Sequence, residues 1–208
     1  MDPNTIANTL SLILFAVSLF VSLRSFYLYM QSRTPRLLIL GVSMFVIALT
    51  AAAGFAGDNI TTISLNVDWF NYIGQTVSFL FILLSLYRSD DGYLRPLSFW
   101  HIAISLLLLI LLLTAPILPD FPNPAITKSL LSGSRGVMCF IIFLAYMTSF
   151  MSKATRFSLL MTGAFLLISF GYLTIVPKYF QPSDVLDHAG DILRITGTLT
   201  LLVAVVVG

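Results

Sequence analysis

Long apolar runs separated by short polar connections make up almost the whole chain. Each run has about the 20 residues that a helix needs to cross the hydrocarbon core of a bilayer. The predicted spans are residues 5–31, 35–56, 66–88, 97–116, 127–151, 156–176 and 183–207. The nine prolines fall in the connections or at the ends of these spans, which supports the division because proline interrupts a helix interior. The pattern predicts an all-α bundle of seven transmembrane helices, forming one domain over residues 1–208.

Basic residues in the connections predict how the bundle is oriented. The connections after the first, third and fifth spans carry Arg24, Arg33, Arg36, Arg88, Arg95, Lys153 and Arg156. The opposite connections carry only Lys128 and Lys178, together with several aspartates. Lysine and arginine in short loops are retained on the cytoplasmic side. We therefore predict a multi-pass protein of the cell membrane with its N-terminus outside and its C-terminus inside.

The composition excludes a soluble domain. The chain is 58% hydrophobic and only 10% charged, whereas about 25% of the residues of a soluble domain are charged. The bilayer is therefore the expected partner, and nucleic acid is not expected. The single cysteine, Cys139, lies in an apolar run and allows neither an intramolecular disulfide nor a cysteine metal cluster. The two histidines lie at opposite ends of the predicted bundle, so we expect no metal and no other cofactor.

The chain contains no motif of a known catalytic chemistry. It has no glycine-rich nucleotide-binding motif, no His-Glu-x-x-His and no Gly-x-Ser-x-Gly. We therefore expect no enzymatic activity.

An internal repeat relates the two halves of the chain. Residues 68–75 and 184–191 share the pattern Asp-x-x-(Asn/Asp)-(Tyr/His)-x-Gly-(Gln/Asp), and residues 32–36 resemble residues 152–156. Both similarities fit a duplication of three helices, with the fourth span joining two parallel triplets. The equivalent pairs are then Asn71 with Asp187, Tyr72 with His188 and Gln75 with Asp191. The alternative is coincidence, because topology alone places basic residues after the first and fifth spans.

Ionisable residues cluster at the start of the last span. An ionisable side chain in hydrocarbon costs at least about 2.5–3.5 kcal/mol unless it is paired or faces water, so it marks a functional site by default. Asp187, Asp191 and Arg194 are spaced at i, i+4 and i+7 and therefore share one helix face. The neighbouring His188 is a further candidate.

Polar residues of two other spans reach a similar depth. Arg135 in the fifth span and Gln75 in the third lie about 12 Å below the outer surface, like Asp191, at about 1.5 Å of rise per residue. We predict an ion pair between Arg135 and Asp191, with Arg194 reached by Asp191 or by a polar group of the third span. The candidate ligand-binding residues are Asn71, Gln75, Arg135, Asp187, His188, Asp191 and Arg194.

The seven-helix, three-plus-one-plus-three plan resembles three groups of proteins. It is similar to the sugar-transporting and PQ-loop families, but the chain lacks their Pro-Gln pair within the spans. It is also similar to the microbial rhodopsins, but the last span has Arg194 and no lysine to attach retinal. The plan and the polar start of the last span resemble the seven-helix membrane sensor modules of bacteria. That resemblance implies a sensor whose output passes to another protein.

Three interpretations of function stay open. The first is a sensor or receptor-like module that binds a small or lipidic ligand in an outer-leaflet pocket and signals to a cytoplasmic partner or within a homo-oligomer. The second is a transporter for a small solute or coupled to protons. The apolar run after Thr200 favours a pocket closed at its inner end over this transporter. The third is a non-catalytic scaffold in which the charges only fix the order of the helices.

Overall fold

The described residues form a bundle of membrane-spanning helices. The structure is a computed structural model and describes residues 3–59, 66–181 and 183–207. Within these ranges there are seven helices long and apolar enough to cross a membrane, and there is no strand. They are α1 (Pro3–Ser32), α2 (Pro35–Asn59), α3 (Asp68–Tyr87), α4 (Asp91–Leu113), α5 (Pro124–Lys153), α6 (Arg156–Ile175) and α7 (Asp184–Val207). The predicted all-α, seven-helix architecture is confirmed.

Two short 3₁₀ turns extend helices at one end of the bundle. The turn η1 (Ala115–Ile117) follows α4, and η2 (Val176–Tyr179) continues α6 to the connection with α7. A proline occupies one of the first two positions of each turn. Proline lacks the N–H that would continue the α-helical ladder.

The start of α4 differs from the prediction. The helix begins at Asp91, so Pro96 lies inside it rather than before it. The missing N–H of Pro96 leaves only the carbonyl of Gly92 without its helical donor, and Gly92 is exposed at the end of the bundle. Arg95 and Asp91 form an exposed i,i+4 ion pair over the same turn. The first turns of α4 are therefore polar, and a hydropathy pattern does not include them.

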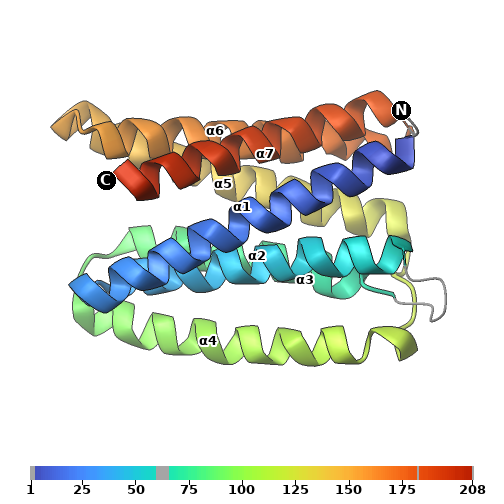
Figure 1. The fold of residues 1–208 in the computed structure, drawn as a ribbon, viewed down its shortest axis with the longest axis horizontal. Helices are drawn as coiled ribbons and strands as arrows, with labels where there is room; N and C mark the ends of the chain where they lie inside the picture. The colour runs from blue at the N-terminus through green and yellow to red at the C-terminus, as the bar shows by residue number, and fades with distance from the viewer. Residues whose placement is uncertain (1–2, 60–65, 182, 208) are drawn as a thin grey trace.

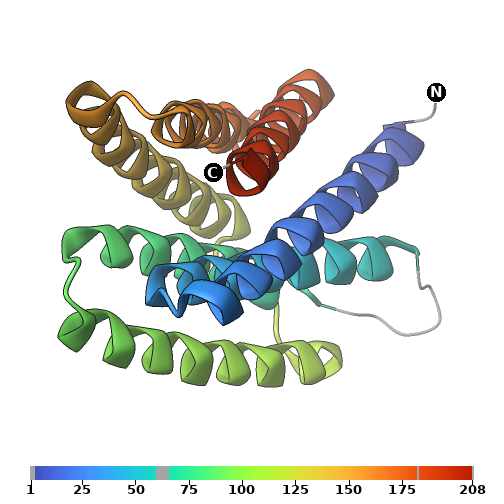
Figure 2. The ribbon, with the colours of Figure 1, turned by 60° about the vertical axis from the view of Figure 1, so that its left-hand side comes forward.

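Two groups of three helices make up the body of the molecule. We call α1–α3 the first triplet and α5–α7 the second triplet. In the first, α1 packs on α2 and α2 on α3, and in the second, α5 packs on α6 and α6 on α7. The triplets meet where α3 contacts α5 and where α1 contacts α7. Helix α4 packs against α2 and α3, on the side of the first triplet that faces away from the second (Figures 1 and 2).

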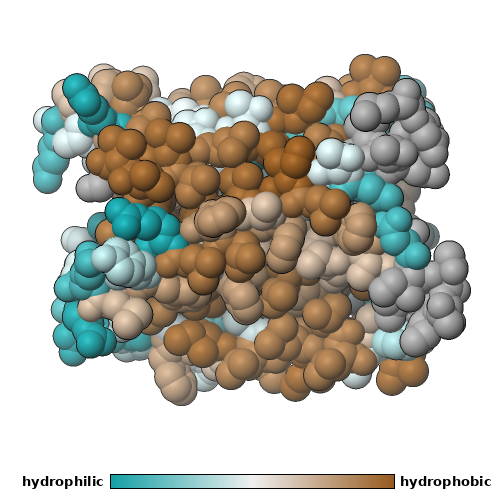
Figure 3. Space-filling view, viewed as in Figure 1, coloured by the Kyte–Doolittle hydropathy of each residue, from teal (hydrophilic) through white to brown (hydrophobic). Residues whose placement is uncertain are grey.

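Polarity follows the long axis of the bundle. The chain enters at one end and finishes at the other, as an odd number of crossings requires (Figure 1). Apolar residues cover the middle of the visible face, and polar residues gather at both ends (Figure 3). This distribution suits a helical bundle with its middle in hydrocarbon and its ends in water.

A shared apolar core closes the middle of the molecule. It takes side chains from all six helices of the triplets, among them Met44, Ile47, Phe79, Phe165 and Leu201. The core separates the end of the bundle that carries the N-terminus from the end that carries the C-terminus.

Glycines bring α6 and α7 into backbone contact. A Cβ atom at Gly171 would lie 2.8 Å from the carbonyl oxygen of Gly190, and a Cβ atom at Gly197 would lie 2.8 Å from the carbonyl oxygen of Ala164. Real Cβ atoms do not approach a carbonyl oxygen that closely, so this packing requires glycine at both positions. Small residues at helix interfaces are a common means of association in membranes. They hold the polar half of α7 firmly against α6.

Candidate functional site

A polar cavity lies between the two triplets at the end of the bundle that carries the N-terminus. Its volume is about 220 Å³, and both triplets contribute to its wall. Six of the seven predicted residues line it, namely Asn71, Gln75, Arg135, Asp187, Asp191 and Arg194. His188 is not part of the lining. Three helices thus bring the predicted side chains together, while their role as ligand contacts stays a prediction.

Arg135 is the most deeply buried charged residue of the site. Its exposure is 3%, and it projects from α5 toward the first triplet. Its Nε donates to the carbonyl oxygen of Leu131 at 3.1 Å, and Nη2 donates to Oγ of Ser132 at 2.7 Å. Its Nη1 donates to Oε1 of Gln75 on α3. All of these partners are neutral.

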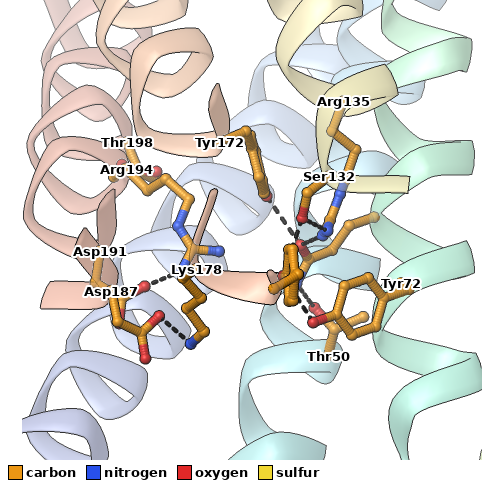
Figure 4. A network of polar contacts seen from close by, with 12 residues as sticks. Thr50, Tyr72, Ser132, Arg135, Tyr172, Lys178, Asp187, Asp191, Arg194 and Thr198 are labelled. Carbon is orange, nitrogen blue, oxygen red and sulfur yellow. Dashed lines mark hydrogen bonds and ion pairs between the residues drawn. The ribbon is translucent and has the colours of Figure 1, made fainter. Parts of the chain in front are cut away.

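Aromatic rings surround the guanidinium group of Arg135. Its Cζ lies 4.9 Å from the ring centre of Tyr72 and 4.6 Å from that of Tyr172. The Cζ of Arg194 lies 5.1 Å from the same Tyr172 ring, so one tyrosine serves two arginines (Figure 4). Ring faces attract cations, by about 2 kcal/mol where water is excluded.

The amide group of Gln75 on α3 forms hydrogen bonds with residues of three other helices. Its Oε1 accepts from the hydroxyl of Tyr172 at 2.9 Å as well as from Arg135. Its Nε2 donates to Oγ1 of Thr50 at 2.9 Å, and Thr50 in turn donates to the carbonyl oxygen of Ile47. Buried polar groups need such partners, and these bonds supply them across α2, α3, α5 and α6.

Tyr179 in η2 bridges the triplets. Its hydroxyl lies 2.8 Å from the hydroxyl of Tyr72 and 3.1 Å from Oγ of Ser132. The three residues belong to η2, α3 and α5, and Tyr179 itself lines the cavity. A ligand that displaced this hydroxyl would break contacts on both triplets at once.

The two acids of the cavity each have a cationic partner. Asp187 Oδ1 lies 2.5 Å from Nζ of Lys178, and Asp191 forms an ion pair with Arg194 one turn along α7 (Figure 4). The predicted contact of Asp191 with Arg194 is confirmed.

The predicted ion pair between Arg135 and Asp191 is wrong. Tyr172 lies between Arg135 and the pair on α7 (Figure 4). Asp191 therefore meets the arginine of its own helix, and Arg135 meets the amide of Gln75. Among the described residues the ion pairs number four, and none includes Arg135.

The charges that line the cavity do not cancel. Lys178, Arg135 and Arg194 supply three positive charges, whereas Asp187 and Asp191 supply two negative charges. The difference, three minus two, is one positive charge, which belongs to Arg135 because the other cations are paired. In the described part of the chain, no three His, Cys, Asp or Glu side chains converge to hold a metal ion.

Three contributors to the site escaped the sequence analysis. The sequence pattern indicates Lys178 only as a charge in a connection, and it does not single out Thr50 or Tyr179. Thr50 is the last polar residue before an apolar stretch of α2, and Lys178 and Tyr179 follow Pro177 at the end of α6. Lys178 and Tyr179 reach the cavity through the packing of η2 against α5 and α7, and Thr50 reaches it through its hydrogen bond with Gln75.

The fold and the cavity define a multi-pass, seven-helix membrane protein with a polar site between two three-helix groups. Comparison of the chain with protein-family models, with curated proteins and with solved structures finds no match. The resemblances drawn from topology therefore stay predictions.

Proposed function

We propose that the protein is a membrane receptor module that binds a small ligand in the cavity and transmits binding as a shift of one triplet on the other. The observation that carries this proposal is the position of the cavity. Side chains of Gln75 on α3, Arg135 on α5 and Asp191 on α7 reach one space between the triplets. A ligand there contacts both moving parts directly, and a coupling free energy of about 1–3 kcal/mol suffices for a response.

The similar lengths and ends of α1 and α5 support the division into two moving parts. Helices α1 and α5 each have 30 residues. Each ends in a left-handed residue, Arg33 or Ala154, with φ of 55° and 48°. The N–H of each donates to the carbonyl oxygen four residues earlier, at 2.8 and 2.7 Å. A threonine follows in both cases before the next helix begins. This alignment pairs Ser32 with Lys153, one residue away from the pairing that the sequences suggest.

We propose that the cavity lies on the axis that relates the triplets. The described lining includes both members of two pairs from this helix-end alignment, Ser11 with Ser132 and Leu14 with Arg135. It also includes both members of two pairs from the sequence repeat, Asn71 with Asp187 and Gln75 with Asp191. Because equivalent positions of two similar units meet on the axis between them, a relative tilt of the triplets changes the shape of this cavity first. In three of the four pairs the first triplet supplies a neutral residue and the second a charged one, and Ser11 and Ser132 are both neutral.

The output of such a tilt is proposed to leave through the opposite end of the bundle. Basic residues gather there, including Arg33, Arg88 and Arg156. We propose that this end is cytoplasmic and that the partner is a signalling protein or a second copy of the chain in the cell membrane.

Cysteine labelling tests the proposed orientation. Cys139 is fully buried and can be replaced by alanine, after which Ser89→Cys and Gln181→Cys place a thiol in exposed connections at opposite ends of the bundle. In intact cells, a membrane-impermeant maleimide is expected to label Gln181→Cys and to leave Ser89→Cys unlabelled until the cells are opened. The reverse labelling pattern would contradict the proposed orientation.

A cavity-filling substitution tests the binding proposal. Gly54 lines the cavity, and a Cβ atom there meets only Nδ2 of Asn71 at 3.5 Å, so a side chain can start at this position and Gly54→Leu is expected to fill part of the cavity. Gly163→Leu is the matched control, because nothing lies within 4 Å of a Cβ atom at that position. Thermal unfolding in detergent is followed with a panel of metabolites. We expect at least one compound to raise the unfolding temperature of the wild type and of Gly163→Leu but not of Gly54→Leu. A panel without any stabilising compound, or one that stabilises all three proteins equally, would argue against the proposal.

A second cavity favours the transporter as the other candidate. It has a volume of about 430 Å³, lies at the opposite end of the bundle and is lined by Arg36, Tyr146 and Phe157 among others. Its described lining includes no residue of α7, so the apolar second half of α7 does not prevent it. The apolar core lies between the two cavities. Uptake of the stabilising compound into proteoliposomes would establish transport. Binding without uptake would favour the receptor proposal.

A further inference from the structure

We propose that the cavity takes a small monocarboxylate, with its carboxylate group bound to Arg135. This inference rests on the proposed function, since it names the ligand of the same cavity. The geometry behind it is one buried guanidinium group that lines the cavity and has only neutral partners.

The burial of Arg135 without an anion requires a physical reason. A guanidinium group keeps its proton, so it cannot become neutral as a buried lysine can. A charge buried without an opposite charge is costly in protein and in hydrocarbon. The neutral oxygens of Gln75 and Ser132 and the two tyrosine rings offset only part of this cost. A ligand carboxylate supplies the missing charge and matches the planar fork of arginine with two parallel hydrogen bonds.

The surrounding charges limit the ligand to a single negative charge. The lining carries one positive charge in excess, as counted above. A second negative charge would meet Asp187 and Asp191 across the same small space. Phosphate and dicarboxylates are therefore disfavoured, because like charges in a poorly hydrated site repel strongly.

The size and the remaining wall of the cavity define the rest of the ligand. A cavity of about 150 Å³ holds a benzene molecule, so the 220 Å³ found here suits a solute of on the order of ten non-hydrogen atoms. The wall away from the arginines includes Leu10, Leu14, Ala51 and Ile195. These side chains suit a short apolar body, and Asn71 in the same lining has a buried Oδ1 that is free to accept one hydrogen bond from it.

The experiment compares carboxylates with neutral and doubly charged analogues on the full chain. Thermal unfolding in detergent is followed with butyrate, benzoate, butyramide, inorganic phosphate and dodecanoate, at constant ionic strength. We expect butyrate or benzoate to raise the unfolding temperature in a saturable way, and butyramide and phosphate to have no effect. A response to dodecanoate alone would point to a lipid chain as ligand and would overturn the proposal of a small solute.

Gln75→Glu is the decisive variant. It places a carboxylate on the atom that already accepts from Nη1 of Arg135 and so supplies an internal counter-ion. We expect it to weaken the carboxylate response at least tenfold while the protein stays folded. Ser134→Ala is the control, because Ser134 is exposed on the same helix, its hydroxyl donates to the carbonyl oxygen of Leu131, and it is not among the described residues that line the cavity. Arg135→Gln removes the charge itself and is expected to abolish the response, which keeps the test valid if Gln75→Glu does not fold.

The experiments distinguish failure of the carboxylate proposal from failure of the receptor proposal. If a neutral or cationic compound of the metabolite panel stabilises the wild type but not Gly54→Leu, the receptor proposal stands and the carboxylate proposal is wrong. An undiminished carboxylate response in both Gln75→Glu and Arg135→Gln would also overturn the carboxylate proposal, because binding would then lie elsewhere.

Discussion

Replacing Gly197 with alanine is expected to lower the free energy of unfolding by about 1–3 kcal/mol, the usual cost of overpacking a filled interface. The added Cβ atom would lie 2.6 Å from Cγ1 of Ile168, 2.8 Å from the carbonyl oxygen of Ala164 and 2.9 Å from the backbone nitrogen of Ile168. A side chain can rotate away, but the two backbone atoms cannot. The α6–α7 pair must therefore separate along its length. Titration with SDS in mixed micelles measures the change.

Gly163→Ala is the matched control for this substitution. Gly163 lies in the middle of α6, and a Cβ atom there has nothing within 4 Å. Alanine favours a helix over glycine by about 1 kcal/mol, so the control is expected to be neutral or stabilising. Equal effects at positions 163 and 197 would mean that the contact between α6 and α7 is looser than described above.

Asp191→Asn is expected to lower the free energy of unfolding by up to about 3 kcal/mol. Breaking a fully buried ion pair costs at least this much, and the pair of Asp191 is partly exposed. Asp191 neutralises Arg194, and both side chains are largely buried, with exposures of 19% and 17%. Without this carboxylate, two uncompensated guanidinium groups would flank the single ring of Tyr172. Thermal or SDS-induced unfolding of the purified variant measures the loss.

Two other aspartates form a graded control series. The side chain of Asp187, paired with Lys178, is 33% exposed, and that of Asp91, paired with Arg95, is 65% exposed. Exposed pairs contribute little, so Asp187→Asn is expected to cost less than about 1 kcal/mol and Asp91→Asn almost nothing. The order of the three effects should follow burial. A loss at Asp91 as large as that at Asp191 would show that the effect reflects overall charge rather than the cavity.

The sequence was sufficient to predict the helices but not their polar ends. Apolar length defines a membrane crossing, and every predicted span corresponds to a helix. Helix α4 begins at Asp91, six residues before its predicted span, because its first turns lie where water satisfies polar groups. A hydropathy pattern identifies the part of a helix that lies in hydrocarbon. It does not show how far the helix continues into water.

The sequence also predicted most of the residues that line the cavity, but it did not predict which aspartate pairs with which arginine. Helical spacing placed Asp187, Asp191 and Arg194 on one face, and depth matched them to Gln75 and Arg135. Which carboxylate meets which arginine depends on the single ring of Tyr172 between them, and on its contacts with both arginines. Such an arrangement follows from packing between helices, which the spacing of residues within each helix does not contain.

The peripheral helix α4 has a consequence for the whole molecule. It contributes no described residue to the cavity and packs outside the first triplet. A group of three crossings ends on the side opposite to its start, so a second triplet joined directly to the first would enter the membrane upside down. The single crossing of α4 restores the direction. Gln75 and Asp191 therefore lie at the same end of the bundle instead of at opposite ends. A helix remote from the cavity thus determines that polar side chains of both triplets meet at one end of the molecule.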